Sequence, residues 1–412
     1  MASTYLTRTF STATNRKIWT WSAWVKKTSL VSDHTNALFG SWYDSNNRSV
    51  IRFNGNRLQF QDTAGTVDVL TSKHFRDTNA WYHIVVAVDT TQATASNRVK
   101  IYVNGEQETA FDTANYPAQN SNTEFQGAVA HYINARKSSS VDSIAETVYS
   151  HVHFCDGTQL APTVFGSTDS TTGEWQINTS PSFTLGNNGF SILKDGNTIT
   201  DQSSNSNNWT LGGGTLTKTE DNPSNIFDTI NPNFAKTGGV AGRDSNIRIF
   251  INNGNTRLST DVALWTTMLG SIPMFSGKYY WECKRTYEGS PSNHLARVGI
   301  EPLDTAGTTL GSPVGTNTDS INYQSEGGGL KGNSSYSGTY ASWQSNNDIV
   351  QIAVDMDNHY IYFGKNGTWQ NSGDPTSGSS GTGGIAITAG KGYVNGFTVH
   401  RGGGSAVEIN QC

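Results

Sequence analysis

The sequence predicts an all-β protein made of two antiparallel β-sandwiches joined by an ordered, turn-rich connector. Residues 348–369 alternate apolar and polar side chains in two runs separated by turn residues, the pattern of a hairpin with one buried face. A looser copy of this pattern occupies residues 83–105. The composition, rich in Gly and aromatic residues together with Asn, Ser and Thr, is typical of β-sheet proteins with many polar turns, and no segment has sustained helical periodicity.

The two hairpins follow one order of strand and turn. Residues 350–356 alternate, and residues 360–363 form a β-rich run that leads to an Asn-Gly pair at 366–367. Residues 83–89 and 99–103 repeat this order and are also followed by Asn-Gly. Because Asn and Gly tolerate positive φ, this pair closes tight hairpins. The repetition predicts two sandwich domains of related construction.

Residues 1–165 are expected to form the first sandwich. Trp19, Trp21 and Ala23 fall on one face of a strand, and Trp24 falls on the other. Further short strands are expected at 36–42, 50–53, 58–60 and 81–89, with a closing strand at 148–154.

Several motifs of this region resemble one family. They are Trp21-Ser22-Ala23-Trp24-Val25-Lys26, Leu38-Phe39-Gly40, Trp81-Tyr82-His83-Ile84-Val85 and Ile101-Tyr102-Val103-Asn104-Gly105. In this order they resemble a laminin-G-like domain, a concanavalin-type jelly roll. The segment 153–166 is similar to the end of that domain in large phage structural proteins.

Residues 166–236 have a different character, because polar turn-rich segments are interrupted by isolated aromatic residues. Pure linkers contain fewer aromatic residues. Trp175, Phe190, Trp209 and Phe227 therefore predict an ordered connector packed on its neighbours, with a few short strands.

Residues 237–412 are expected to form the second sandwich. Its motifs are Gly277-Lys278-Tyr279-Tyr280-Trp281-Glu282, Val298-Gly299-Ile300, Val354-Asp355-Met356-Asp357 and Phe363-Gly364-Lys365-Asn366-Gly367-Thr368-Trp369. In this order they resemble a SPRY domain. Gly-rich segments at 327–329 and 378–384 depart from the family pattern and affect the expected loop shapes, not the fold.

Composition excludes several classes of function. Only 15% of the residues are charged and the net charge is -5, which argues against nucleic-acid binding because that requires a basic face. The first residues lack the apolar core of a signal peptide, and no segment is long enough for a transmembrane helix. Cys155, Cys283 and Cys412 are too scattered for a disulfide framework or a zinc site, so we expect free thiols and synthesis in a cytoplasm.

The sequence offers no recognisable catalytic motif. Concanavalin-type folds include glycosidases, which need two carboxylates a few ångströms apart. The nearest candidates are Asp355 and Asp357, which share a strand face, and Glu282. Asp357 lies where a hairpin must turn, so turn capping is the favoured interpretation and no catalytic residue is predicted.

Two groups of side chains, a histidine pair and an acidic turn, are candidate metal ligands. His151 and His153 share one strand face, but no third ligand is adjacent, so ordinary strand surface is favoured. Asp44 with Asn46 and Asn47 could offer oxygen ligands to a calcium ion at the sandwich rim, and a polar hairpin turn explains them equally well. No metal and no cofactor is predicted.

Aromatic residues in two turn-rich loops are the stronger lead, because sugar rings stack on Trp and Tyr while Asn, Asp and Arg bind their hydroxyls. The candidate ligand-binding residues are Trp42, Tyr43, Asp44 and Arg48 in the first loop and Tyr323 and Tyr336 in the second. We expect Tyr43, Tyr323 and Tyr336 to be exposed. Burial in the core is the competing interpretation for Trp42, Tyr340 and Trp343.

These two domains without a secretion signal resemble a tailed-phage virion protein. The leading hypothesis is a non-enzymatic tail-fibre or spike component that recognises host-surface glycan. The second is a capsid decoration or knob protein that binds only other virion proteins, favoured because the first domain begins near Met1 without a stalk. The third is a glycan depolymerase. We expect a homo-oligomer in the virion, made in the host cytoplasm, with other virion proteins and host polysaccharide as partners.

Overall fold

The computed structural model describes residues 4–30, 36–138, 140–194, 196–237, 249–260, 265–287, 294–305, 313–336, 338–401 and 407–411. Within these ranges the regular structure is antiparallel β-sheet with short 3₁₀ turns and no α-helix, so the predicted all-β class is confirmed. The turns are η1 (Thr63–Gly65), η2 (Ala95–Asn97), η3 (Glu124–Gln126), η4 (Pro162–Val164), η5 (Gln370–Ser372) and η6 (Gly378–Ser380). The described ranges hold no helix long and apolar enough to cross a membrane. The chain divides into two compact units, Met1–Ile226 and Phe227–Cys412.

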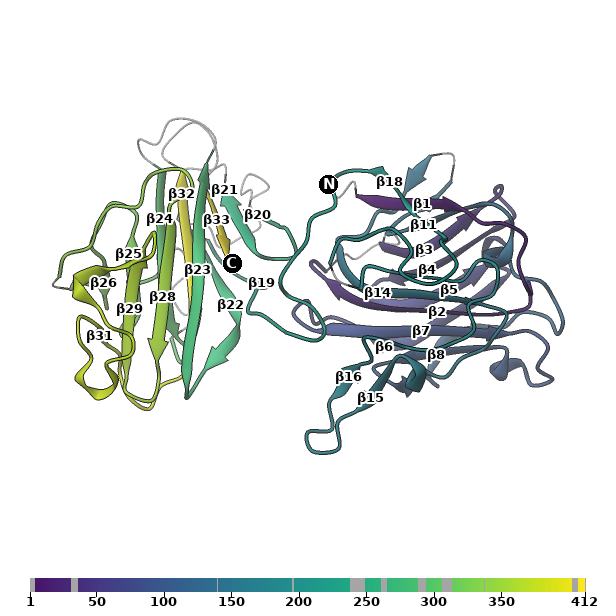
Figure 1. Ribbon diagram of the computed structural model, residues 1–412, viewed down its shortest axis with the longest axis horizontal. Coiled ribbons are helices and arrows are strands. Elements are labelled where there is room, and N and C mark those ends of the chain that lie inside the picture. Colours follow the sequence, from purple (N-terminus) through teal and green to yellow (C-terminus); the bar gives the residue numbers. More distant parts are fainter. Residues whose placement is uncertain are drawn as a thin grey trace. The chain divides into compact units, whose positions relative to one another are not determined.

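Two antiparallel sheets form the first unit (Figure 1). Sheet A has eight strands in the spatial order β10 (Phe111–Asn115), β6 (Val67–His74), β5 (Arg57–Asp62), β4 (Arg48–Asn54), β3 (Asn36–Trp42), β11 (Ala130–Ile133), β1 (Tyr5–Thr9) and β18 (Thr210–Gly213). Sheet B has six, in the order β17 (Phe190–Ile192), β14 (Thr147–Asp156), β2 (Ile18–Lys27), β7 (Trp81–Asp89), β8 (Val99–Val103) and β9 (Glu106–Gln107). Two small ribbons are β12 (Arg136–Lys137) with β13 (Val141–Asp142) and β15 (Gly166–Thr168) with β16 (Trp175–Ile177).

An aromatic core fills the first unit. Trp19 and Trp21 of β2 are fully buried, in one cluster with Phe39 of β3 and Phe154 of β14. The Trp21 and Phe39 rings stack with their centroids 6.0 Å apart. Trp24 lies outside this cluster, as the alternation of strand side chains predicts. Replacing one such buried tryptophan with Ala costs about 3–5 kcal/mol of folding free energy, so this cluster is a main source of the unit's stability.

Most of the expected connector is part of the first sandwich. Strand β17 pairs with β14 in sheet B, and β18 pairs with β1 at the edge of sheet A. Phe190 is fully buried and Trp209 is 3% exposed, and both belong to the core cluster. The division of the chain falls after Ile226, so residues 166–226 complete the first unit instead of standing between two domains.

Two further sheets form the second unit (Figure 1). The seven-stranded sheet has the order β19 (Ile230–Thr237), β22 (Thr266–Met274), β32 (Tyr393–Arg401), β24 (His294–Pro302), β25 (Ile321–Gln324), β26 (Leu330–Lys331) and β27 (Ser334–Ser335). The other, eight-stranded, has the order β20 (Ile249–Asn252), β21 (Arg257–Thr260), β33 (Val407–Gln411), β23 (Lys278–Tyr287), β28 (Ile349–Asp355), β29 (Tyr360–Lys365) and β30 (Thr368–Trp369), with β31 (Ile385–Ala386) paired to β29.

Both predicted hairpin patterns are confirmed. Asn104 and Gly105 turn the chain from β8 into β9 with φ of 48° and 82°. Asn366 and Gly367 do the same between β29 and β30 with φ of 48° and 84°. Positive φ at both central residues is the type I′ geometry that matches the twist of the flanking strands.

Two of the three cysteines lie in the described residues. Cys155 in β14 and Cys283 in β23 are buried free thiols, as predicted. Cys412 lies outside the described residues.

Candidate functional site

The β3–β4 hairpin places candidate ligand-binding residues at one end of sheet A. Trp42 ends β3, Arg48 begins β4, and the two are paired across the strands. Paired residues lie on the same face, and the Arg48 guanidinium carbon is 5.8 Å from the centre of the Trp42 ring. Trp42 itself is half-buried, and Tyr43, the first loop residue, is 67% exposed. The hairpin therefore carries an aromatic–cation pair at its base and an exposed tyrosine in its loop.

Asp44 closes the loop of this hairpin. Its carboxylate accepts hydrogen bonds from the backbone N–H groups of Asn46, at 2.8 Å, and Asn47, at 2.9 Å. It also accepts from the Asn47 side-chain amide, and these bonds together lower the pKa of Asp44. Asp44 thus holds the loop that carries Tyr43. The described ranges contain no group of three or more His, Cys, Asp or Glu residues suited to a metal ion.

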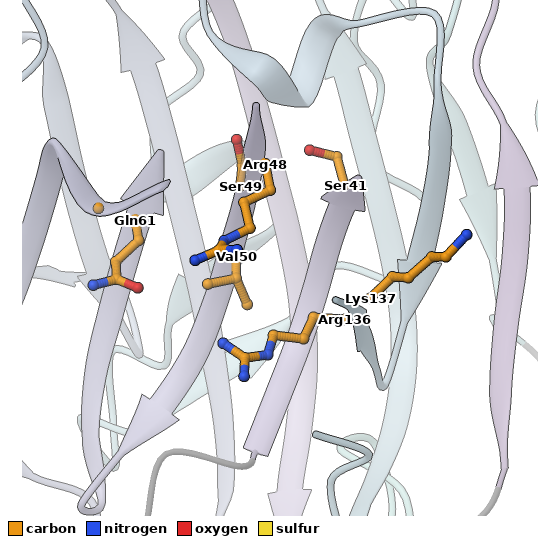
Figure 2. Close-up of a pocket in the computed structure, with 8 residues that line it drawn as sticks. Ser41, Arg48, Ser49, Val50, Gln61, Arg136 and Lys137 are labelled. Carbon is orange, nitrogen blue, oxygen red and sulfur yellow. The ribbon is translucent and has the colours of Figure 1, made fainter. Parts of the chain in front are cut away.

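A small pocket lies beside the hairpin (Figure 2). Its lining residues are Ser41, Arg48, Ser49, Val50, Gln61, Gly65, Arg136 and Lys137. The cavity holds about 30 Å³. That is room for one or two water molecules or a small polar group, not for a whole sugar ring.

Gly40 allows the β12–β13 ribbon to lie close over β3 and form one wall of the pocket. A Cβ atom at Gly40 would lie 3.0 Å from the carbonyl oxygen of Ala135 and 3.2 Å from the Cα atom of Arg136. Gly40 is paired with Val50, which lines the pocket. The missing side chain therefore brings Arg136 to the face that also carries Arg48.

A hydrogen-bonded network spans strands β4, β5 and β6 next to the pocket. Arg52 donates to the side-chain oxygens of Gln59, at 2.7 Å, and Gln61, at 2.9 Å. Both glutamines donate to the Asp68 carboxylate, at 2.7 Å and 3.1 Å. Burial, and then the neighbouring Arg136 cation, lower the pKa of Arg52 to about 10, although Asp68 raises it. The network fixes Gln61 in the pocket wall and holds a buried positive charge nearby.

Positive charge predominates around this pocket. Arg136 donates through Nε to Asp142 at 2.8 Å. Among the residues that the structure describes, Arg48 and Lys137 form no ion pair. In Figure 2 the Arg48 and Arg136 guanidinium groups extend toward the same part of the sheet, near Val50, whereas the Lys137 ammonium points away from them. The two guanidinium groups are therefore the cations best placed to meet a ligand.

Comparison with protein families divides the chain in the same way. Residues 2–144 match the family described as the concanavalin A-like lectin/glucanases superfamily. Residues 278–393 match the SPRY domain family. These matches support a concanavalin A-like domain in the first unit and a SPRY domain in the second. The hairpin and its pocket belong to the concanavalin A-like domain. A search of curated proteins gives no match.

Solved structures of low sequence identity resemble parts of the chain. The SPRY domain of human HERC1 is 17% identical, covers 44% of this chain and 96% of its own, and has a TM-score of 0.33. A second human SPRY domain is 15% identical, with 40% and 96% covered and a TM-score of 0.29. A "putative carbohydrate binding protein" from Bacteroides ovatus is 17% identical, with 54% and 60% covered and a TM-score of 0.34.

The aromatic residues of the second candidate loop, in the SPRY domain, are buried or half-buried. Tyr323 is fully buried, so its predicted exposure is wrong, and Tyr336 is half-buried. The Tyr336 hydroxyl donates to the Asn322 carbonyl at 2.7 Å, and burial raises the pKa of Tyr336. Both rings pack edge to face with Tyr340, with centroids 5.1 Å away for Tyr336 and 5.6 Å away for Tyr323. Trp343 is also fully buried, which confirms the core interpretation for that residue.

The paired histidines are buried in the concanavalin A-like domain, so the strand-surface interpretation is wrong. His151 is 5% and His153 is 2% exposed. His83 is also buried, with Nε2 2.9 Å from the Ser22 hydroxyl and Nδ1 accepting from Trp175 at 3.0 Å. Burial lowers the pKa of His83 to about 3 and that of His153 well below its usual value. The lowered pKa values keep His83 and His153 neutral near pH 7.

The carboxylates considered for catalysis are engaged in a turn of the SPRY domain. Asp355 accepts from the backbone and side-chain N–H groups of Asn358, both at 2.9 Å, and from Lys278. Burial raises the pKa of Asp355, but these hydrogen bonds outweigh it and lower the pKa to about 2. Asp357 accepts from the backbone N–H of Gly277 at 2.7 Å. Asp355 thus caps the turn that follows β28, and Asp357 binds the backbone just before β23.

Sequence reasoning missed the other wall of the pocket. Arg136 and Lys137 are distant from the hairpin in sequence and form no motif with it. The only local signal was in the alternation of β4 and β5, which places Arg52, Gln59 and Gln61 on one face.

Proposed function

We propose that this protein is a non-enzymatic surface protein of a tailed phage that binds host-surface glycan through the hairpin of its concanavalin A-like domain. The observation that carries the proposal is that exposed Tyr43, half-buried Trp42 and Arg48 share one hairpin beside a polar pocket, with Arg48 in no ion pair among the described residues. Aromatic faces stack on the apolar faces of sugar rings, and guanidinium and amide groups bind hydroxyls. An aromatic pair beside such donors is the arrangement that a sugar site requires.

The hairpin is also held in shape before any ligand arrives. Asp44 fixes the loop, and the paired Trp42 and Arg48 fix its base. A site that is ordered in advance loses less conformational entropy on binding. This favours recognition of short glycan units, which provide few contacts each.

The absence of a catalytic role is part of the proposal. The candidate carboxylates for hydrolysis, Asp355 and Asp357, are engaged in hydrogen bonds with backbone N–H groups, and neither lies in the domain that contains the pocket. Repeated copies on a particle would supply avidity, since linked weak sites bind far more tightly than one. A homo-oligomer in the virion is therefore included in the proposal.

A second candidate, a structural protein that binds other virion proteins, is favoured by the SPRY domain surface. Phe275 is 66% and Tyr280 is 56% exposed there. Exposed aromatic residues are enriched at protein interfaces. A contact between the SPRY domain and the particle is compatible with either candidate, and binding of host glycan distinguishes the two.

The test is binding of the purified full chain to host cells and to an array of bacterial surface polysaccharides. Tyr43→Ala should abolish most binding, whereas Tyr280→Ala, which removes an exposed tyrosine from the SPRY domain, should not change it. Equal loss with Tyr280→Ala, or full binding by Tyr43→Ala, would contradict the assignment. Antibody labelling of purified particles tests the virion part, since a protein absent from every particle would overturn it.

A further inference from the structure

The pocket next to the hairpin has the properties of an anion site. We infer that it binds the carboxylate of an acidic sugar whose ring stacks on Trp42 and Tyr43, so the recognised glycan is an acidic polysaccharide. This inference rests on the proposed function and adds the chemical class of the ligand.

Three arginine side chains give the pocket an excess of positive charge. Arg48 and Arg136 line it directly, and Arg52 is held behind Gln61. Arg136 and Arg48 both lower the pKa of Arg52, after the larger effect of burial, so the three guanidinium groups are close enough to repel one another. A bound anion would relieve this repulsion.

The carboxylates of this region do not neutralise the positive charge of the three arginines. Asp142 pairs with Nε of Arg136, and Asp68 accepts from the two glutamines of the network. Asp62 accepts from the Ser49 hydroxyl and from the backbone N–H of Glu124, and its burial raises its pKa to about 6. Arg48 takes part in no ion pair among the described residues and keeps its donors available.

The size of the pocket restricts the ligand group. About 30 Å³ admits a small planar substituent and excludes a sugar ring. A carboxylate has two oxygens in one plane, which matches the forked donors of a guanidinium. The ring to which that carboxylate is attached would remain outside the pocket.

Position links the pocket to the aromatic residues. Ser41, a lining residue, precedes Trp42 in β3, and Arg48 both lines the pocket and lies over the Trp42 ring. A sugar stacked on the hairpin aromatics is therefore adjacent to the pocket mouth. One ligand unit can use both features at once.

The experiment compares native acidic polysaccharides on an array with the same polymers after carboxyl reduction, which converts each uronic acid into the neutral sugar. Wild type should bind the native acidic polymers and lose about tenfold or more in affinity for the reduced ones, the effect of one charge-assisted contact. Arg48→Gln should cause a loss of the same size with native polymer and little with reduced polymer. Arg48→Lys should retain part of the affinity. Lys218→Gln, a charge-matched control with a 53% exposed side chain, should bind like wild type.

Each outcome has a distinct meaning. Equal binding of native and reduced polymers, with Tyr43→Ala still abolishing both, would overturn the anion inference and leave the proposed function standing. Binding confined to sulfated polymers would assign the oxyanion to a sulfate and overturn the carboxylate assignment. Absence of binding to every polymer and to host cells would overturn both.

Discussion

Asp221 ties the last part of the first unit to sheet B, and its replacement tests whether residues 166–226 are an integral part of that sandwich. Its carboxylate accepts from Lys26 Nζ at 2.8 Å and from Trp81 Nε1 at 3.1 Å. The Lys26 and Asp221 side chains are only 1% and 3% exposed. Asp221→Ala removes this carboxylate from a buried cation, a change that costs about 3–5 kcal/mol, against about 0–1 kcal/mol for a surface pair.

The assay is denaturant unfolding of the full chain, with hydrogen exchange to show which unit has lost stability. Glu220→Ala is the matched control, because Glu220 is adjacent in sequence, its side chain is 70% exposed, and its ion pair with Lys218 is 3.5 Å long. We expect faster exchange throughout Met1–Ile226 for Asp221→Ala and a change within about 0.5 kcal/mol for Glu220→Ala. A loss below about 1 kcal/mol for Asp221→Ala, or one confined to the second unit, would refute the reasoning.

The remaining predictions concern pH, the SPRY domain and thiol reactivity. The pKa of His83 is about 3 in the folded protein, against an ordinary value of 6.5. The unfolded state therefore binds a proton more readily than the folded state, and the free energy of unfolding falls as the pH drops below 6.5. At pH 5 the loss from His83 is about 2 kcal/mol, with a loss of the same sign from His153; a flat unfolding midpoint between pH 7 and 5 would contradict this. Tyr336→Phe removes the hydroxyl bonded to the Asn322 carbonyl, so the SPRY domain should lose about 1 kcal/mol in unfolding experiments while polysaccharide binding stays unchanged. Reduced binding by this variant would argue for a site in the SPRY domain. Burial raises the pKa of Cys155 to about 11, so its native thiol should react with a disulfide reagent at pH 8 far more slowly than in denatured protein, and equal rates would show that the site is open.

Strand and turn chemistry made the fold predictable from the sequence. The strands β28 and β29 follow from local alternation, and the Asn-Gly pairs at 104–105 and 366–367 adopt the positive φ that their residue types favour. These features depend on neighbours in sequence. The extent of the first sandwich was less visible, because Phe190 and Trp209 join a core whose other members are distant in the chain.

The candidate site was predictable only in part, because some of its residues are distant from one another in the sequence. The hairpin residues Tyr43 and Arg48 are local, and their composition indicated a polar, aromatic turn. Arg136 reaches them because Gly40 lets another segment lie close, and no local pattern encodes that contact. Tyr323 was predicted to be exposed because its loop is rich in Gly and Ser, yet packing in the SPRY domain buries it.

The central claim is that glycan binds at the hairpin of the concanavalin A-like domain, and hydrogen exchange with and without the bound polysaccharide tests it most directly. We predict that ligand slows exchange in residues 41–50 and 135–142, which contain the aromatic pair, Arg48 and the pocket wall. Slower exchange confined to the SPRY domain, or binding that leaves both of these segments unchanged, would contradict it.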